Sequence, residues 1–221
     1  TPQWFISMES HKLRKKAIDS IDQTNFYPEK GKTRIRSMIE TRPDWCISRQ
    51  RSWGVPLPIF IDKKTNEPLR DPEVIENIAK IYEKEGSDCW FHDDPQRFLG
   101  KKYNKDNYIK SKDIVEVWFD SGSTHSFVLE KRKDLKWPAS MYLEGSDQHR
   151  GWFHSSLLES CGTRGRAPFE SILSHGFVVD GKGMKMSKSA GNIISPEDIL
   201  KKYGADILRL WVASSDYAED L

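Results

Sequence analysis

The sequence has few cysteines, and they are not spaced for a disulfide framework or a zinc site. Cys46, Cys89 and Cys161 are odd in number and far apart, and no Cys-x-x-Cys occurs. Cys89 and His92 lie close together in sequence, but no second Cys/His pair accompanies them. We therefore expect no structural metal in this segment and a reducing compartment, the cytoplasm.

Long apolar runs and a strong charge of one sign are also missing. No apolar stretch approaches the roughly 20 residues that cross a bilayer, and the opening TPQWFISMES is unlike a secretory signal. Lysine and arginine (35) nearly balance aspartate and glutamate (33), giving a net charge of +2. The lack of a long apolar run disfavours a membrane protein. The balanced charge and the lack of an aromatic–basic repeat disfavour a general nucleic-acid binder.

Segments of strand length alternate with segments of helical periodicity. We expect strands at residues 140–143 and 176–179, with a helix at 151–160 between them. Two further helices should begin at capping side chains followed by proline and end at glycine. These helices are expected from Asp71-Pro72-Glu73 to Gly86 and from Ser195-Pro196-Glu197 to Gly204. The alternation predicts an α/β fold with a mostly parallel sheet.

Polar stretches suggest how the chain is divided. Residues 25–32, which include Pro28 and Gly31, are expected to form a loop, and residues 87–112 to be irregular. The expected segments are 1–61, a small α/β insertion at 62–112, a second main segment at 113–204, and the start of a helical region at 205–221. Because no methionine opens the chain and a helix begins close to its end, we expect a piece of a longer protein.

The first segment with chemical potential is Gly181–Asn192, GKGMKMSKSAGN. Its glycines predict a flexible loop, its lysines place three ammonium groups on a short stretch, and Ser187 and Ser189 add hydroxyl donors. Such a loop can close over a polyphosphate and neutralise charge that develops in a transition state. By composition alone, an exposed polar loop without function is an equally good interpretation.

The second segment is Tyr142–Phe153, YLEGSDQHRGWF. A strand ends here and polar side chains precede a helix, which is where open α/β sheets bind ligands. Glu144 can accept a hydrogen bond from an ammonium group, Asp147 and Gln148 can bind hydroxyls or an amino acid, and Trp152 can form an apolar wall. An ordinary charged turn is the alternative, and for His149 and His154 we expect surface or satisfied histidines without a base role.

These segments resemble the class I aminoacyl-tRNA synthetases. Lys185–Ser189 reads KMSKS, the second signature of that class, between HGFVVDGKG and SPEDILKKYGADILRLW. TPQWFISM, WCISRQRSWGVPLP, EVWFDSGS and YLEGSDQHRGWF are similar to isoleucyl-tRNA synthetases in particular. The resemblance covers nearly the whole chain, is weakest over 62–112, and implies the C-terminal half of a Rossmann-like catalytic domain.

The resemblance also implies residue roles. Those matching the aminoacyl-adenylate site of the family are Glu144, Gly145, Asp147, Gln148, Trp152, Trp118, His175 and Gly176. Trp152 and Trp118 are candidates for contact with the isoleucine side chain, with core packing an equal alternative for Trp118. Those matching the ATP site are Lys188, Lys185, Ser187, Met186 and Ser189, and Mg²⁺ is expected to arrive with ATP.

The implied reaction is ATP-dependent activation of L-isoleucine to isoleucyl-adenylate, then transfer to tRNA(Ile), by a parent enzyme expected to be a monomer. The first signature of the class, His-x-Gly-His, is absent, and the family's editing and anticodon-binding regions are not recognised. We therefore expect this chain alone to be inactive. The alternatives are a valyl- or leucyl-tRNA synthetase fragment, or a stand-alone nucleotide-binding module derived from a synthetase.

Overall fold

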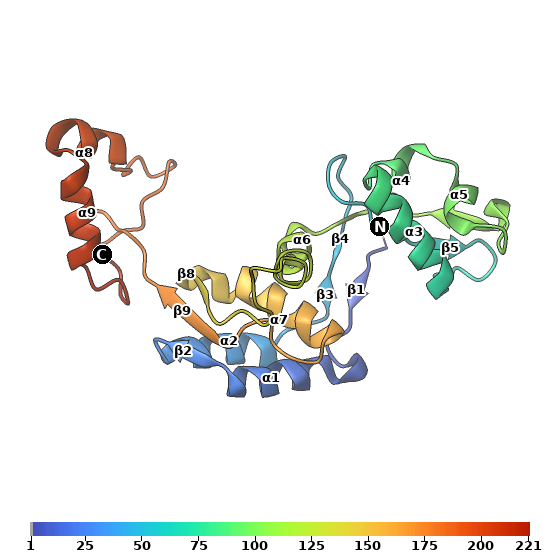
Figure 1. The fold of residues 1–221 in the computed structure, drawn as a ribbon, viewed down its shortest axis with the longest axis horizontal. Helices are drawn as coiled ribbons and strands as arrows, with labels where there is room; N and C mark the ends of the chain where they lie inside the picture. Colours follow the sequence, from blue (N-terminus) through green and yellow to red (C-terminus); the bar gives the residue numbers. More distant parts are fainter. Residues whose placement is uncertain (1) are drawn as a thin grey trace. The chain divides into compact units, whose positions relative to one another are not determined.

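The structure, a computed structural model, describes residues 2–221 and has two compact units (Figure 1). The first unit contains the residues up to Met8 and Pro43–Ser121, and the second contains Glu9–Arg42 and Gly122–Leu221. Within the described residues, no helix is both long enough and apolar enough to span a bilayer.

A three-stranded parallel sheet, with strand order β2–β9–β8, organises the second unit. β9 (Ser171–His175) lies in the middle and pairs in parallel with β2 (Asn25–Tyr27) and β8 (Tyr142–Gly145). The carboxyl ends of all three strands therefore face the same edge of the sheet. This arrangement confirms the predicted α/β fold with a parallel sheet.

Helices α1 (Leu13–Gln23), α2 (Lys30–Glu40) and α7 (Trp152–Thr163) lie around this sheet (Figure 1). α1 packs against both α2 and α7. α7 is buried along most of its length, from Phe153 to Cys161, as expected for a helix that is covered on all sides. Burial lowers the pKa of His154 to about 3, so this histidine is neutral.

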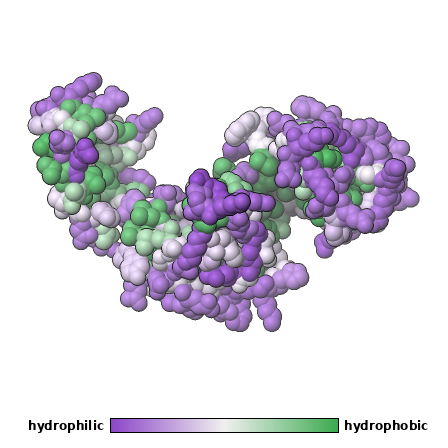
Figure 2. Space-filling view, in the orientation of Figure 1, coloured by the Kyte–Doolittle hydropathy of each residue, from purple (hydrophilic) through white to green (hydrophobic). Residues whose placement is uncertain are grey.

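The other elements of the second unit are η1 (Ser10–Lys12), the π-helical turn η3 (His125–Leu129), the 3-10 turn η4 (Ser146–His149), α8 (Pro196–Tyr203) and α9 (Ala205–Ser214). The last two are helices near the end of the chain. α8 begins as predicted, since the Glu197 N–H donates to Ser195 Oγ at 3.2 Å. Figure 2 shows apolar side chains gathered on α8 and α9, where Leu200, Ile207, Leu210 and Trp211 are exposed.

The first unit contains three short antiparallel strand pairs and several helices. The pairs are β1 (Phe5–Ile6) with β3 (Trp45–Cys46), β4 (Ser48–Arg49) with β7 (Ile114–Val115), and β5 (Phe60–Asp62) with β6 (Tyr108–Lys110). The helices are α3 (Pro72–Glu85), α4 (Cys89–His92), α5 (Pro95–Leu99), the 3-10 turn η2 (Lys105–Asn107) and α6 (Val117–Gly122).

Trp90 is at the centre of the first unit's hydrophobic core. Its side chain is fully buried, and the rings of Phe60 and Phe98 lie with their centroids 5.0 Å from it. The indole N–H donates to the Ser111 carbonyl at 2.8 Å, so its polar atom is satisfied inside the core. Val74, Ile78 and Leu99 complete the cluster.

Three local predictions were wrong. Residues 25–27 form β2 rather than a loop, because Phe26 is buried and the strand pairs with β9. Residues 87–112 contain α4, α5 and β6, since widely spaced apolar side chains there fill the Trp90 core. The strand expected at 176–179 lies instead at Ser171–His175, and the Val179 N–H donates to the carbonyl of Leu221.

Asp71 links the start of α3 to the segment after α5. One carboxylate oxygen accepts the Glu73 N–H at 2.9 Å and caps the helix, and the other accepts Lys102 Nζ at 2.6 Å and the Tyr103 hydroxyl at 2.7 Å. Lys102, then Tyr103 and the Glu73 N–H, lower the pKa of Asp71 to about 2. The carboxylate therefore stabilises the first unit when it is ionised.

We expect Asp71→Asn to lower the melting temperature at neutral pH, since the amide keeps a helix-capping oxygen but loses its charge. Because the folded pKa lies below the unfolded value, the stabilisation is complete above about pH 4 and is lost as the pH falls through about 2. Thermal unfolding of wild type and variant at several pH values should show curves that converge in acid. A difference that stays constant down to pH 2 would contradict this role for the charge.

Candidate functional site

The carboxyl ends of β8 and β9 bring together four of the residues predicted for the adenylate site. The strand register places Glu144 opposite Ser174 and Gly145 opposite His175. Gly176 follows directly, and the His175 Nδ1 atom lies 2.7 Å from the Gly176 carbonyl oxygen. Glu144 is exposed at this edge, so its carboxylate is available to a ligand.

Gly145 allows these groups to approach one another closely. A Cβ atom at this position would lie 2.9 Å from Asp147 Oδ1, 3.6 Å from the His175 ring and 3.7 Å from the Phe177 ring. A side chain would therefore displace the Asp147 carboxylate. The absence of a side chain lets the strand end, the following turn and the end of β9 form one compact surface.

A buried histidine supports the turn that carries Asp147 and Gln148. His149 is 1% exposed, its Nδ1 atom lies 2.7 Å from the Ser146 carbonyl, and burial lowers its pKa. On its other side, His149 Nε2 would lie only 2.8 Å from a Cβ at Gly31, in α2. His149 therefore fills the space between the turn and α2 and has a supporting position, not an exposed one.

A hydrogen bond shows which end of the Gln148 side-chain amide is the carbonyl oxygen and which is the NH₂ group. The Gln148 Oε1 atom accepts the Trp152 backbone N–H at 2.9 Å, at the start of α7. Because an N–H can only donate, the carbonyl end of the amide is fixed by the helix. Its Nε2 atom lies 3.4 Å from Asp147 Oδ2, a long contact. The NH₂ group is thus the part of Gln148 that can donate to a ligand.

The two tryptophans predicted to contact the isoleucine side chain belong to different units. Trp152 begins α7 in the second unit and is partly exposed. Trp118 lies in α6 within the first unit and is 42% exposed, so it is not a core residue of that unit. Its role at the site stays a prediction.

Phe177 connects the sheet edge to the lysine loop. Its ring is next to Gly145, and Lys185 Nζ lies 4.2 Å from the ring centroid, in the range of a cation–π contact. Phe177 was not predicted from the sequence. Phe177 lies within the strand predicted at 176–179, whereas β9 ends at His175, so the prediction assigned this side chain to the sheet and not to the site.

Asp180 and Asn192, also missed in the sequence, hold the two ends of the lysine loop. Asp180 Oδ1 accepts the N–H groups of Lys182 and Met184, each at 2.9 Å, and its Oδ2 accepts Asn192 Nδ2 at 2.9 Å. Asn192 Oδ1 in turn accepts the Ser187 N–H at 3.0 Å. The Asn192 bond is the main cause of the lowered pKa of Asp180. An aspartate before Gly-Lys-Gly is a turn signal that could have identified it.

The residues predicted for the ATP site lie in the loop that Asp180 and Asn192 hold together. The Ser187 and Ser189 hydroxyls lie 3.2 Å apart, and the Met186 sulfur accepts the Ile194 N–H at 3.4 Å. Lys185 and Lys188 are exposed. The loop therefore presents cationic and hydroxyl groups from a backbone that is hydrogen-bonded to itself.

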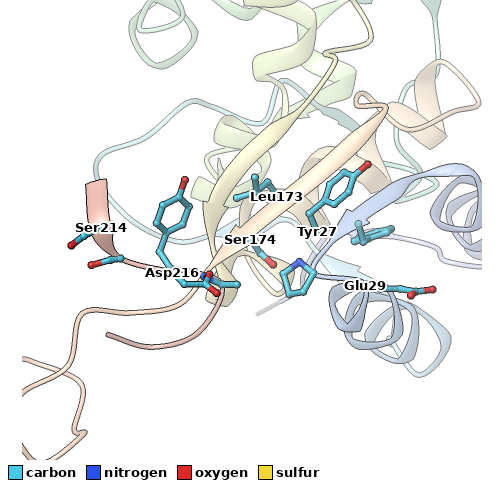
Figure 3. A pocket seen from close by; sticks show the side chains of 11 residues that line it. Tyr27, Glu29, Leu173, Ser174, Ser214 and Asp216 are labelled. Carbon is cyan, nitrogen blue, oxygen red and sulfur yellow. The ribbon is translucent and has the colours of Figure 1, made fainter. Parts of the chain in front are cut away.

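Two pockets adjoin the end of β9. His175 and Gly176 line one of about 280 Å³, together with Trp211 and Tyr217. The other, of about 810 Å³, lies at the carboxyl ends of β2 and β9 (Figure 3). In that view Leu173 and Ser174 separate Tyr27 and Glu29 from Ser214 and Asp216. None of the predicted site residues lines the larger pocket.

The comparisons with known proteins agree with the resemblance seen in the sequence. Over residues 1–221 the chain matches the family described as tRNA synthetases class I (I, L, M and V). It is 80% identical, over its whole length, to an isoleucine–tRNA ligase of Pelagibacter ubique and covers 24% of that protein. It is 56% identical to an isoleucine–tRNA ligase of Syntrophotalea carbinolica, again over 100% of this chain and 24% of the other. The chain thus spans about a quarter of the length of these relatives.

Solved structures support the fold. A Mycobacterium tuberculosis methionyl-tRNA synthetase bound by methionyl-adenylate is similar with a TM-score of 0.59 and 20% identity, over 99% of this chain and 34% of that one. The LeuRS of Agrobacterium radiobacter K84, in a ternary complex with tRNA and LeuAMS, has a TM-score of 0.55 and 22% identity, over 80% and 25%. From its sequence match and its fold, the chain belongs to the class I tRNA synthetases (I, L, M and V).

Proposed function

We propose that this chain is the part of an isoleucine–tRNA ligase that holds the aminoacyl-adenylate and the phosphates of ATP. The observation that carries the proposal is the 80% identity, over all 221 residues, to an isoleucine–tRNA ligase. The likeness to leucyl and methionyl enzymes is near 20% and supports the fold alone. The substrates of the longer protein would be L-isoleucine, ATP and tRNA(Ile), and its place the cytoplasm, where proteins are made.

The proposed reaction has two steps. An isoleucine carboxylate oxygen attacks the α-phosphorus of ATP, forming the mixed anhydride, and the bond to the β-phosphate breaks so that pyrophosphate leaves with the negative charge. A ribose hydroxyl at the tRNA end then attacks the acyl carbon, and AMP leaves. Neither step needs a protein nucleophile, so positioning and charge stabilisation can supply the catalysis.

The geometry suggests a division of these tasks. Glu144, exposed at the end of β8, would bind the ammonium group of isoleucine. The Gln148 amide would donate a hydrogen bond to an oxygen of the adenylate, and Asp147 would accept ribose hydroxyls. Gly145, His175 and Gly176 would form the floor beside the nucleoside, with Trp152 against the isoleucine side chain.

The lysine loop would act on the phosphates. Lys185 and Lys188 would compensate the charge that moves onto pyrophosphate, with Ser187 and Ser189 as hydroxyl donors and Met186 supporting the turn. Among residues 2–221, no three His, Cys, Asp or Glu side chains gather as a metal site. A Mg²⁺ ion that arrives with ATP would be held chiefly by its phosphate oxygens and would neutralise phosphate charge.

The function is tested by amino-acid-dependent exchange of pyrophosphate into ATP, using the longer protein that contains this chain. We expect exchange with isoleucine to exceed that with valine and leucine. Preference for valine or leucine would support the valyl or leucyl alternative. No exchange with any of the three, from a folded protein, would contradict the proposal and support a nucleotide-binding role without amino-acid activation.

Lys188→Met in the longer protein should lower the exchange rate about 100- to 1,000-fold, the usual effect of removing one group that stabilises transition-state charge. The KM for isoleucine should change little, since the lysine acts on the phosphates. Lys201→Met, an exposed lysine of α8, is the matched control and should retain the wild-type rate. Equal losses in both variants would mean that only the general positive charge matters.

Gln148→Glu separates the two ends of the side chain. The carboxylate can still accept the Trp152 N–H and so keep the start of α7, but the donor is lost and a second negative charge is placed beside Asp147. A hydrogen bond to a charged group contributes about 1.5–3 kcal/mol, so we expect kcat/KM for isoleucine activation to fall about 10- to 100-fold. Gln148→Ala should lower both activity and melting temperature. Wild-type activity in Gln148→Glu would exclude a donor role.

A further inference from the structure

The indole of Trp152, at the start of α7, is stacked on the ring of a buried tyrosine, Tyr142. The rings of Trp152 and Tyr142 have centroids 4.1 Å apart and an interplanar angle of 1°. Tyr142, on β8, is 4% exposed, whereas Trp152 is partly exposed. One face of the indole is therefore covered by Tyr142, while part of the side chain remains available for contact with a ligand.

Tyr142 is itself held in place by two further rings. Phe169 lies with its centroid 4.9 Å away at an angle of 57°, and Phe153 lies 6.5 Å away at 38°. Both phenylalanines are buried in the core of the second unit. Burial raises the pKa of the Tyr142 hydroxyl to about 12, so the ring is neutral at ordinary pH. Tyr142 is thus a fixed surface against which the indole lies.

The same strand also carries the carboxylate proposed to bind the substrate ammonium. Tyr142 and Glu144 are two positions apart in β8, so their side chains leave the same face of the sheet. Their Cα atoms are about 7 Å apart along an extended strand. The indole wall and the ammonium-binding group are therefore spaced by one short piece of backbone rather than by a loop.

We propose that Tyr142 is a positioning residue that fixes the Trp152 indole and thereby sets the discrimination between isoleucine and valine. The inference rests on the proposed function. Isoleucine and valine differ by one methylene, and an apolar pocket distinguishes such a pair by only about 10- to 200-fold, a limit for which isoleucyl enzymes are the standard example. A wall that tilts leaves room for either side chain, so selectivity depends on keeping the indole in one orientation.

The test compares Tyr142→Leu and Tyr142→Phe in the longer protein, measuring exchange with isoleucine and with valine together with the KM for ATP. Tyr142→Leu should lower the isoleucine/valine ratio of kcat/KM about tenfold or more, mainly through a higher KM for isoleucine, and leave the KM for ATP unchanged. Tyr142→Phe keeps the stacked ring and should keep the wild-type ratio. Phe26→Leu, a buried aromatic of β2 in the same sheet, is the matched control and should keep the ratio even if the melting temperature falls.

A double-mutant cycle shows whether Tyr142 acts through the indole. In a Trp152→Ala background, Tyr142→Leu should have no further effect on the ratio. An unchanged ratio in Tyr142→Leu, an equal loss in Tyr142→Phe or Phe26→Leu, or an additive loss in the double variant overturns the inference while the proposed function stands. A wild-type protein without isoleucine-dependent exchange overturns the proposed function and this inference together.

Discussion

The parallel pairing of β8 with β9 is the constraint on which the candidate site depends. Its register places Gly145 beside His175, so that two segments far apart in sequence end at the same level. Side-chain alternation then directs Tyr142 and Glu144 to one face. A shift of one residue would reverse the faces of these side chains and separate them from the turn after β8. The candidate site therefore depends on the strand register more than on any single side chain.

Around that register, the supporting contacts are short and local. His149 and Gly31 fix the turn against α2, Gln148 joins the turn to α7, and Phe177 extends the sheet edge to Lys185. His149 fills a space that would otherwise be empty, and Gln148 accepts an N–H at the start of α7. Preorganisation of this kind is what the proposed reaction would require, because positioning and not a protein nucleophile would catalyse it.

The sequence was sufficient where local chemistry decides the structure, as at Asp71 and Ser195, whose caps and following prolines fixed the starts of α3 and α8. It was also sufficient for the fold class and, through the KMSKS and YLEGSDQHRGWF resemblances, for the family, whereas the candidate site residues stay a prediction. It was insufficient where pairing over long distances decides. β2 has a single buried side chain, Phe26, and β9 precedes the more apolar residues 176–179, so periodicity favoured the wrong segments. The supporting roles of Tyr142 and Asn192 could not be predicted, because each depends on which side chain it meets in space, whereas Asp180 before Gly-Lys-Gly carried a turn signal that was missed.

The carboxylate of Asp180 has an electrical consequence beyond holding the loop. Between Asp180 and Asn192 the chain carries three lysines and this one carboxylate, a local charge of +2, in a protein that is otherwise nearly balanced. Such a field attracts a polyphosphate over little more than a Debye length, about 8 Å at physiological ionic strength. The rate at which a nucleotide arrives should therefore respond to salt, while the hydrogen bonds that Asp180 and Asn192 make within the loop should not. The attraction of the loop for a nucleotide therefore depends on ionic strength, whereas the conformation of the loop does not.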